Sequence, residues 1–302
     1  MALTILPGPL LRERTTLRLG GPAMAEVVVR DADDCAALPA ALARLGGRPL
    51  VLGRGSNILA SDDALSVVVV TPAVGETPTV LGDVRDERGQ GVLVRVGAAF
   101  RLPRLLVWAS TQGLAGLEGL AGIPGTVGGA VAMNAGSYGC ETGACVERVE
   151  VVDSVHGPRV LGREQLEFAY RHFSVRGEDV LPTWHIVTAV VFRFRQTESA
   201  IIRHTMREVH IKKKSTQPIA AHSAGCIFKN PTQKESAGKL LDDAGMKGMR
   251  YGDMAFSELH ANFLINLGNG TSREADYLIK IAQERICKIN SISLVLEVKV
   301  VV

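Results

Sequence analysis

Two glycine-rich segments have the composition most suited to binding an anion. The first is Gly53-Arg54-Gly55-Ser56-Asn57, and the second runs from Gly122 to Gly139. Because glycine has no Cβ, its backbone N–H groups can approach a ligand closely, and successive N–H groups form a concave site for phosphate. Two such segments could hold a pyrophosphate from either side. Tight turns without a ligand would use the same residues, and composition alone does not separate the two interpretations.

Other glycine motifs are excluded by spacing. Glycine recurs at every third position from Gly113 to Gly128, but these six triplets hold one proline and do not form a collagen helix. A Walker loop needs Ser or Thr after Gly-Lys, whereas Leu240 follows Gly238-Lys239. A dinucleotide fingerprint needs a third glycine at the position of Ile58. The phosphate-binding loops of these two common classes are therefore absent.

The composition is that of a globular protein. The 302 residues include 46% apolar side chains, and 34 basic against 31 acidic residues give a net charge of +3. This charge excludes a strongly polycationic nucleic-acid binder, although not a local basic pocket. Apolar runs such as Leu65 to Val70 are much shorter than the roughly 20 residues that span a bilayer, and Pro7 and Pro9 interrupt the N-terminal stretch that a signal peptide would need. We expect a cytoplasmic protein that binds neither nucleic acid nor membrane.

The five cysteines do not form a recognisable framework. They stand at positions 35, 140, 145, 226 and 287, an odd number without the paired spacing of a disulfide scaffold. Cys140 and Cys145 have no histidine or further cysteine at the spacing of a zinc site. We therefore predict no metal site.

Strands and helices must position the two glycine segments. Before the first segment, the pattern predicts a strand over 26–30, a helix capped by Asp31 or Asp33 that ends near Leu45, and a strand over 49–52. Further strands are expected over 67–71, 92–96, 146–152 and 185–195, with a surface hairpin or loop over 76–91.

The composition changes near residues 196–199, where we place a domain boundary. An amphipathic helix is predicted over 198–213, with Ile201, Ile202, Thr205 and Val209 on one side. Thr271 to Glu274 fits a capping box that opens a helix with an apolar face, formed by Ala275, Leu278, Ile279, Ala282 and Ile286. A last strand is predicted over 292–302. The uneven alternation of helices and strands predicts an α+β fold.

The order of several short motifs resembles one enzyme family. The matching stretches are Thr16 to Ala23, Leu52 to Leu59, Gly122 to Gly129, Asn134 to Gly136, Tyr170-Arg171, Ser223 to Pro231 and Glu297. Each is weak alone, but the ordered set resembles the UDP-N-acetylenolpyruvoylglucosamine reductase family, in its shorter type. The resemblance implies a two-subdomain FAD-binding fold of the vanillyl-alcohol-oxidase/PCMH type, with subdomains at 1–72 and 73–197. It also implies a C-terminal α+β substrate-binding domain at 198–302.

The resemblance implies non-covalently bound FAD, with NADPH as the hydride donor. It places the two glycine segments around the FAD pyrophosphate and isoalloxazine. The cofactor-binding residues implied are Gly53, Arg54, Gly55, Ser56, Asn57, Ile58, Gly122, Ile123, Gly125, Thr126, Gly128, Gly129, Asn134 and Gly136.

Three residues are implied as catalytic. Arg171 would place its guanidinium near the enolpyruvyl carboxylate and the flavin, where charge develops during hydride transfer. The alternative is that Arg171, which follows the aromatic Tyr170, is a surface residue with its charged end in solvent. Glu297 would complete the acid side of the site, although a lone glutamate in the predicted apolar strand also suits a solvated face.

Cys226 departs from the family pattern. Most members have serine at this position, where the residue returns a proton to the substrate carbon. A thiol can also donate a proton, and with an ordinary pKa near 8.5 it is more acidic than a hydroxyl. We predict that Cys226 is the general acid and that activity falls as the thiol ionises at alkaline pH. The alternative is a small buried cysteine that packs as a hydrophobe.

The substrate implied is a UDP-sugar. Tyr170, Lys229, Asn230 and His260 lie in stretches similar to the family's substrate-binding ones. A cluster of basic residues could also bind the diphosphate, or it could form a solvated face of the predicted helix. The cluster comprises Arg203, Arg207, Lys212, Lys213 and Lys214.

The reaction implied has two halves. NADPH reduces FAD, and the reduced flavin passes a hydride to the enolpyruvyl double bond of UDP-N-acetylglucosamine enolpyruvate, giving UDP-N-acetylmuramate for peptidoglycan synthesis. One alternative is a flavin-dependent oxidase of a sugar or lactone on the same fold. No histidine precedes His156, which argues against a histidyl flavin tether in the N-terminal region but not against a cysteinyl one. A non-catalytic flavin- or nucleotide-binding protein is a further alternative, although it would not need Arg171, Cys226 and Glu297 together.

Overall fold

The chain contains two compact units. A computed structural model describes residues 3–177, 184–232 and 234–302. Unit 1 comprises residues 1–7, 25–53 and 68–211, and unit 2 comprises residues 8–24, 54–67 and 212–302. The C-terminal region thus shares a unit with two segments from the first quarter of the chain. The division into 1–72, 73–197 and 198–302 remains a prediction.

A four-stranded sheet and one helix form the N-terminal part of unit 1. The strands lie in the order β1 (Thr4–Pro7), β2 (Ala23–Val29), β5 (Leu65–Pro72) and β3 (Arg48–Val51). Helix α1 (Ala32–Leu45) begins where the Asp31 carboxylate accepts a hydrogen bond from the Asp34 N–H, at 2.9 Å. Its buried Leu38 and Leu42 pack with Val27 and Val68 of the sheet. The predicted strands and helix of this region are confirmed.

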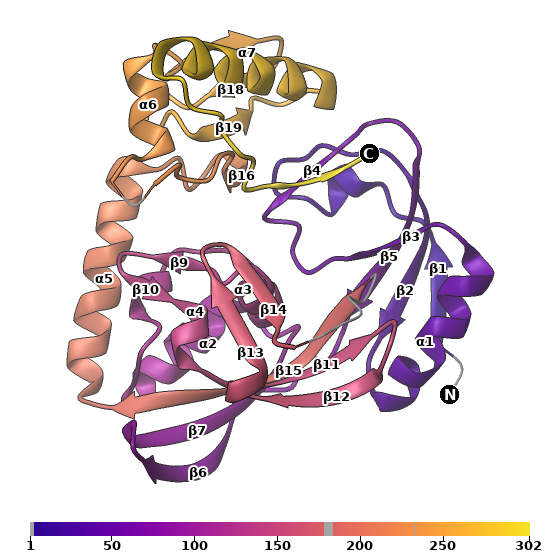
Figure 1. Cartoon of the computed structure of the whole chain (residues 1–302), viewed down its shortest axis with the longest axis vertical. Coiled ribbons are helices and arrows are strands. Elements are labelled where there is room, and N and C mark those ends of the chain that lie inside the picture. The colour runs from indigo at the N-terminus through magenta and orange to yellow at the C-terminus, as the bar shows by residue number, and fades with distance from the viewer. Residues whose placement is uncertain (1–2, 178–183, 233) are drawn as a thin grey trace. The chain divides into compact units, whose positions relative to one another are not determined.

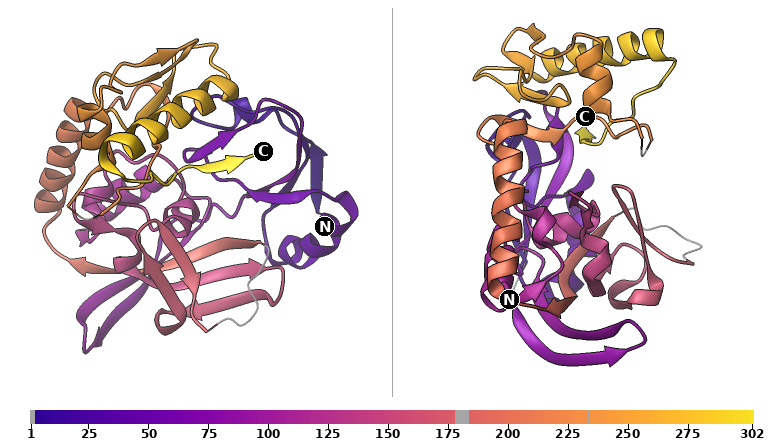
Figure 2. Two further views of the ribbon diagram at one scale, coloured as in Figure 1. Left: turned by 45° about the horizontal axis from the view of Figure 1, so that its top comes forward. Right: turned by 90° about the vertical axis from the view of Figure 1, so that its left-hand side faces the viewer.

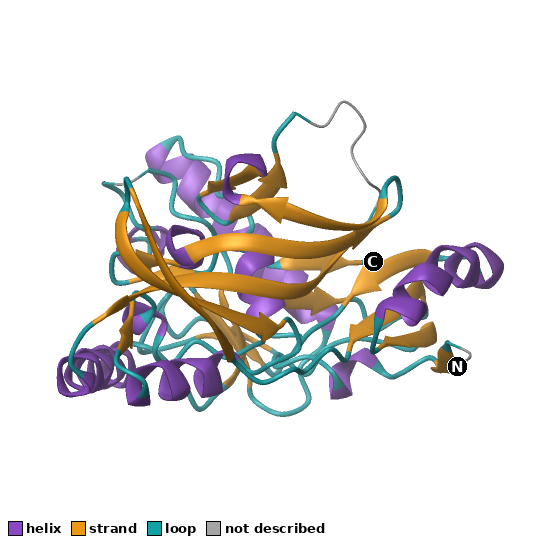
Figure 3. Cartoon of the chain, turned by 90° about the horizontal axis from the view of Figure 1, so that it is seen from below, coloured by secondary structure: helices purple, strands orange, loops and turns teal. Residues whose placement is uncertain are grey.

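A six-stranded sheet forms the larger part of unit 1 (Figures 1 and 3). Its strands lie in the order β12 (Gly157–Gly162), β11 (Val146–Asp153), β15 (His185–Gln196), β7 (Gly89–Gly97) and β6 (Thr79–Asp86), and β8 (Leu114–Ala115) pairs with the end of β15. Strands β6 and β7 form the hairpin allowed for residues 76–91, and the predicted strands at 92–96, 146–152 and 185–195 are confirmed.

Short elements cover this sheet. Helix α2 (Leu102–Thr111) buries Leu102, Leu105 and Leu106 in the same core as Val94 and Val190 of the sheet. The other short elements of this part are the three-residue helical turns Glu118–Leu120 and Arg163–Gln165, helices α3 (Val127–Ala132) and α4 (Thr142–Cys145), and the hairpins β9 (Gly136–Ser137)–β10 (Cys140–Glu141) and β13 (Leu166–Ala169)–β14 (His172–Val175). A further helical turn, Leu11–Glu13, belongs to unit 2.

Helix α5 (Ser199–Thr216) confirms the helix predicted over 198–213 (Figure 2). Its buried positions are Ile202, Val209 and Lys213, whereas Ile201 is 54% exposed. Thr205 is exposed as well, so the prediction of Ile201 and Thr205 on the packed side is wrong. Ile202, with Val209 seven residues later, sets the apolar stripe, and Ile201 lies about 100° away from Ile202 around the helix.

Unit 2 has its own sheet and core. The strands lie in the order β16 (His222–Cys226), β19 (Phe263–Asn266), β18 (Met254–Phe256) and β17 (Arg250–Tyr251), accompanied by α6 (Ala237–Asp243) and α7 (Ser272–Asn290). In the predicted capping box, Thr271 accepts from the Glu274 N–H and Glu274 accepts from the Thr271 N–H. All five residues predicted for the apolar face of α7 are buried.

The predicted strand over 292–302 is wrong for most of its length. Only β20 (Lys299–Val301) is a strand, and it pairs in parallel with β4 (Ile58–Ala60). Leu296 makes a single bridge with Phe228 on another part of the chain. The backbone of this extended segment pairs with Phe228 before Val298 and with β4 after it, so no continuous ladder forms. Leu294, Val298 and Val301 are nevertheless buried.

Asp62 joins an early segment to the C-terminal region of unit 2. Its carboxylate accepts hydrogen bonds from the Ser272 N–H at 2.6 Å and the Gly20 N–H at 3.1 Å, and its own N–H donates to Ser272 Oγ at 3.0 Å. Asp62→Ala is expected to lower the free energy of unfolding by about 2–3 kcal/mol, since hydrogen bonds to a carboxylate at a helix N-terminus are lost.

Chemical denaturation measures this change, and the neighbouring Asp63→Ala is the matched control. The Asp63 side chain is 78% exposed and its ion pair with Arg273 spans 3.9 Å, so its loss is expected to cost less than about 0.5 kcal/mol. Equal losses in the two variants would contradict the structural role of Asp62.

Candidate functional site

Within unit 1, Gly53 approaches Thr126 of the second glycine segment, whereas residues 54–57 of the first segment belong to unit 2. A Cβ on Gly53 would lie 2.7 Å from Thr126 Oγ1, so glycine is required for this approach. Gly122 and Gly125 adopt φ of +83° and +127°, a region that favours glycine. Gly55 has φ of +62°, and a Cβ there would lie 2.2 Å from the Arg14 carbonyl oxygen. Several of these glycines are therefore explained by the protein's own turns and packing.

Backbone N–H groups nevertheless remain available in both segments. Within residues 3–177, 184–232 and 234–302, the N–H groups of Gly53, Arg54 and Gly55 donate to no protein acceptor, and the same holds for Gly122, Gly125 and Thr126. Successive free donors of this kind suit an anion such as a pyrophosphate. Each set of donors, taken by itself, therefore fits a phosphate group such as those of a flavin dinucleotide.

The start of helix α3 does not supply such donors. The Val127 N–H donates to the Phe100 carbonyl, the Gly128 N–H donates to the Ala98 carbonyl, and the Gly129 N–H donates to Thr126 Oγ1 at 3.3 Å. Gly128 is also required for packing, since a Cβ there would lie 2.9 Å from the Ala98 Cβ. The donors of the second segment therefore lie in the turn that precedes α3.

Arg171 occupies the two-residue turn between β13 and β14. Ala169 and His172 pair across this turn, and Arg171 adopts φ of +55°. Its Nη2 donates to the Gly136 carbonyl at 3.1 Å, and its guanidinium carbon lies 4.9 Å from the centroid of the Tyr170 ring. Arg171 is half-buried and Tyr170 is exposed, so the turn presents a cation beside the second glycine segment of unit 1.

Cys226 lies at the end of β16, directly after an irregular pairing. The register with β19 shifts between Ser223 and Cys226, and Gly225 adopts φ of +81°. A bulge of this kind bends the strand and re-aims the side chain that follows it. The Cys226 thiol is half-buried, between the buried Ala224 and Ile227.

Glu297 is adjacent to the Cys226 segment within unit 2. The Glu297 N–H donates to the Ile227 carbonyl at 2.7 Å, and the Lys229 N–H donates to the Val295 carbonyl at 2.8 Å. The prediction that Glu297 lies in a strand is wrong, since it stands between the Phe228–Leu296 bridge and β20. The backbone segments that carry the candidate catalytic residues Cys226 and Glu297 are nonetheless adjacent through this short antiparallel pairing.

Side chains from the first quarter of the chain tie this pair to the first glycine segment. Asn57 Nδ2 donates to the Glu297 carbonyl at 3.1 Å, and the Lys299 N–H donates to the Asn57 carbonyl at 3.0 Å. Thr16 Oγ1 donates to the Ser223 carbonyl at 2.6 Å. Sequence reasoning did not give Thr16 a role, although it lies in the first matching motif. For Asn57, the sequence predicted a contact with the cofactor but not this contact with the Glu297 segment.

The buried amide Asn262 also escaped sequence reasoning. Its Nδ2 donates to the Phe228 carbonyl at 2.8 Å, and its Oδ1 accepts from the Phe228 N–H at 3.0 Å. The Ile227 N–H donates to the Asn262 carbonyl. This side chain takes the place of a strand partner and fixes the two residues that follow Cys226.

The candidate substrate residues of unit 2 occupy different environments. Asn230 Oδ1 accepts from the Ala237 N–H at the start of α6, at 3.1 Å. Lys229 is half-buried beside the Cys226 segment. Burial and the Lys247 charge lower the pKa of His260, whose Nδ1 accepts from the Asn262 N–H. The neutral His260 ring packs 5.0 Å from the Phe263 ring and over Gly238, which suits a structural role.

Of the remaining predicted cofactor residues, Ile58 is buried in β4 and Ile123 packs against the core of unit 1. Ser56 is half-buried in the first segment. Lys213 of the basic cluster is only 2% exposed, unlike the exposed Arg203 and Lys214.

Comparison with known proteins identifies the family. The description "UDP-N-acetylenolpyruvoylglucosamine reductase, C-terminal domain" applies to a family model that matches residues 217–301, and the FAD binding domain model matches residues 23–158. The UDP-N-acetylenolpyruvoylglucosamine reductase of Nitratidesulfovibrio vulgaris is 54% identical over 298 residues, which cover 99% of this chain and 98% of that protein. This chain belongs to the UDP-N-acetylenolpyruvoylglucosamine reductase family.

Further members support the assignment. The protein of the same name from Oleidesulfovibrio alaskensis is 50% identical, over 99% of each chain. The crystal structure of UDP-N-acetylenolpyruvylglucosamine reductase from Thermus caldophilus matches with a TM-score of 0.80 and 35% identity, over 100% of both chains. The predicted family and fold, an α+β FAD-binding domain followed by an α+β C-terminal domain, are confirmed.

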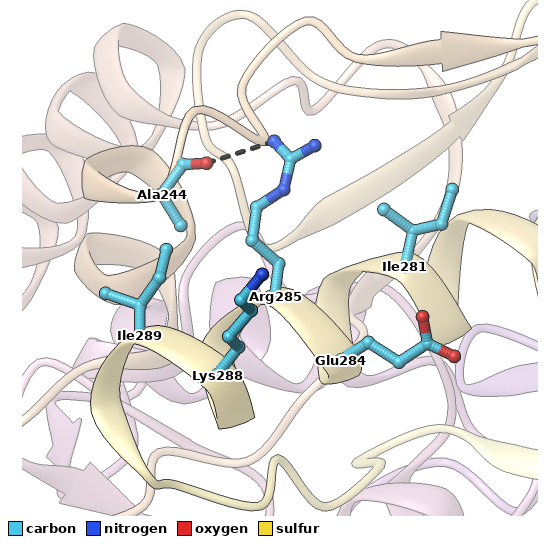
Figure 4. A pocket seen from close by; sticks show the side chains of 6 residues that line it. All are labelled: Ala244, Ile281, Glu284, Arg285, Lys288 and Ile289. Carbon is cyan, nitrogen blue, oxygen red and sulfur yellow. Dashed lines mark hydrogen bonds between the residues drawn. The ribbon is translucent and has the colours of Figure 1, made fainter.

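A surface groove in unit 2 lies outside the family motifs (Figure 4). Its volume is about 640 Å³, and it is lined by Ala244, Ile281, Glu284, Arg285, Lys288 and Ile289. Arg285 Nη1 donates to the Ala244 carbonyl at 3.1 Å across it. None of the predicted site residues lines this groove.

Two further observations concern the described residues alone. They contain no helix long and apolar enough to cross a membrane. They also contain no group of three or more His, Cys, Asp or Glu side chains arranged to hold a metal ion.

Proposed function

We propose that this member of the family is a flavin-dependent reductase that acts on UDP-N-acetylglucosamine enolpyruvate. It uses NADPH and forms UDP-N-acetylmuramate for peptidoglycan precursor synthesis. The observation that carries the proposal is the pairing of the Cys226 segment with the Glu297 segment, tied by Asn57 to the first glycine segment. A proton donor and a carboxylate beside a pyrophosphate-binding turn are the groups that this reduction needs.

The glycine segments would hold the cofactor. The free N–H groups at 53–55 and at Gly122, Gly125 and Thr126 bind the pyrophosphate of FAD. When bound and reduced by NADPH, FAD supplies the hydride for the enolpyruvyl double bond.

Each candidate catalytic residue has a defined task in this proposal. Arg171 binds the enolpyruvyl carboxylate and stabilises the negative charge that builds up next to it. Cys226 donates a proton from Sγ to the substrate carbon that does not receive the hydride. Glu297 completes the acid side of the site and orients the enol group, and Lys229 binds the diphosphate of the UDP-sugar.

The proposal includes a cytoplasmic location. All five cysteines are free thiols, of which Cys35 is buried and Cys145 is half-buried. Burial raises the pKa of Cys145 to about 12 and that of Cys35 to about 11. Unpaired thiols are usual in a reducing compartment.

Anaerobic stopped-flow absorbance tests the function. Addition of NADPH to the flavin-loaded protein is expected to bleach the flavin band, and the enolpyruvyl UDP-sugar is expected to restore it without oxygen. UDP-N-acetylglucosamine, which lacks the double bond, is the matched control and should leave the band bleached. Recovery with oxygen alone would favour an oxidase, and a protein that binds no flavin would overturn the proposal.

A further inference from the structure

Asn134 has a side chain whose hydrogen bonds are all directed into unit 1. It lies two residues after the end of α3, is 0% exposed and adopts φ of +39°. Its Nδ2 donates to the Ala169 carbonyl and to Glu141 Oε2, each at 3.0 Å. Its Oδ1 accepts from the Gly143 N–H at 2.9 Å. Because both amide hydrogens are used inside the protein, this side chain has no donor left for a cofactor.

The contact with Ala169 fixes the position of the Arg171 turn. Ala169 is the last residue of β13, and the turn Tyr170-Arg171 follows it immediately. Asn134 therefore holds the backbone of the hairpin at the point where the turn begins. This partly buried hydrogen bond ties the exposed Ala169 to a fully buried amide, so loss of the donor would remove an internal anchor of the hairpin where the turn begins.

The Arg171 side chain is held by the same short segment. Arg171 Nη2 donates to the carbonyl of Gly136, two residues after Asn134. Gly136 pairs with Glu141 in the β9–β10 hairpin, and Glu141 is the second acceptor of the Asn134 amide. The base of the turn and the tip of the guanidinium are therefore both positioned from residues 134–136.

We propose that Asn134 is a positioning residue for Arg171, and that it places the guanidinium relative to the second glycine segment. The inference rests on the proposed function, in which Arg171 binds the enolpyruvyl carboxylate. Asn134 acts through the hairpin and touches neither the reacting atoms nor the cofactor with its side-chain donors.

Asn134→Asp tests this role because aspartate keeps the shape and tolerates a positive φ. It replaces the two N–H donors by an oxygen that faces the Ala169 carbonyl and the Glu141 carboxylate. Displacement of Arg171 by a fraction of an ångström is expected to slow reoxidation of the reduced flavin by the UDP-sugar about 30-fold. Flavin reduction by NADPH is expected to change less than about threefold, so the loss should appear in the substrate half-reaction and in kcat, beside any fall in the melting temperature that the buried carboxylate causes.

The matched control is Asn266→Asp, a second buried amide that lies in unit 2. Its Nδ2 donates to the Leu17 carbonyl at 3.1 Å, and its Oδ1 accepts from the N–H groups of Gly268 and Gly270. It is expected to lower the melting temperature and leave the ratio of the two half-reaction rates unchanged. If Asn134→Asp also changes only the melting temperature, Asn134 is a structural residue and the inference fails.

A double-mutant cycle with Arg171→Gly gives the sharper test. If Asn134 acts through Arg171, Asn134→Asp should cost less than about threefold once the guanidinium is absent. Equal costs in both backgrounds would overturn the inference. If Arg171→Gly alone leaves substrate reduction unchanged, the proposed role of Arg171 is wrong, and the inference about Asn134 is wrong with it. This outcome differs from an additive cycle, in which Arg171 keeps its role and only the inference about Asn134 is wrong.

Asn134→Asp could also disturb folding by placing two carboxylates together. Asn134→Asp combined with Glu141→Gln removes this repulsion and leaves the Ala169 contact broken. In the double variant, reoxidation of the flavin by the UDP-sugar is expected to be as slow as in Asn134→Asp. It is therefore expected to be about 30-fold slower than in Glu141→Gln alone. Full recovery of that rate would mean that the contact with Ala169 is unimportant, and would contradict the inference.

Discussion

Cys226→Ala is expected to slow the reduction of the enolpyruvyl substrate by about 10²- to 10⁴-fold, the usual contribution of a general acid. The half-reaction with NADPH should keep its rate, because no proton is transferred to the substrate in that step. Cys226→Ser should retain part of the activity, since a hydroxyl can donate from nearly the same position. Single-turnover absorbance of the flavin measures both half-reactions separately.

The control for this substitution is Cys287→Ala. Cys287 is an exposed thiol on α7 in the same unit, so its removal should leave both half-reactions unchanged. Full activity of Cys226→Ala would remove the general-acid assignment. In that event the half-buried Cys226 would be a packing residue, and the bulge at Gly225 would need another explanation.

The elements that could be predicted from the sequence carry their own local signals. Helix α7 has a capping box and an apolar face at helical spacing, and both features form as predicted. Helix α1 begins at an aspartate that accepts from the N–H three residues later. Signals of this kind act within one turn of helix, so distant contacts do not override them.

The final strand was not predictable in the same way. Residues 292–302 alternate as a strand would, but their partners lie at 227–229 and at 58–60, far away in the sequence. A period of two indicates an extended chain and does not say which segment will pair with it. The error in placing Glu297 within a strand follows directly from this.

Glycine was the least specific signal for the site. Gly53, Gly55 and Gly128 would each bring a Cβ into protein atoms, so steric need explains them without any ligand. The stronger indication of a phosphate site is the set of N–H groups without protein acceptors, which requires coordinates. The Tyr170-Arg171 turn had no sequence signal either, since it lacks the Asn-Gly or Asp-Gly pair that favours positive φ.

Arg171→Gly is expected to reduce the rate of substrate reduction by about 10²- to 10³-fold, comparable to the loss of a main electrostatic donor. Glycine is the informative replacement because Arg171 adopts φ of +55°. Alanine keeps the backbone strain of about 1 kcal/mol that arginine already carries at this φ, whereas glycine relieves it. Arg171→Ala and Arg171→Gly should therefore differ in melting temperature and agree in the rate of substrate reduction.

Arg171→Lys completes this series, since lysine keeps the charge without the planar pair of donors. It cannot bind a carboxylate through two parallel N–H groups, so an intermediate rate and a raised KM for the UDP-sugar are expected. Steady-state kinetics with the substrate, together with the anaerobic NADPH half-reaction as internal control, measures the difference. If the lysine variant matched the parent protein, a positive charge alone would be sufficient. If all three variants were fully active, Arg171 would be a surface residue that only packs on Tyr170.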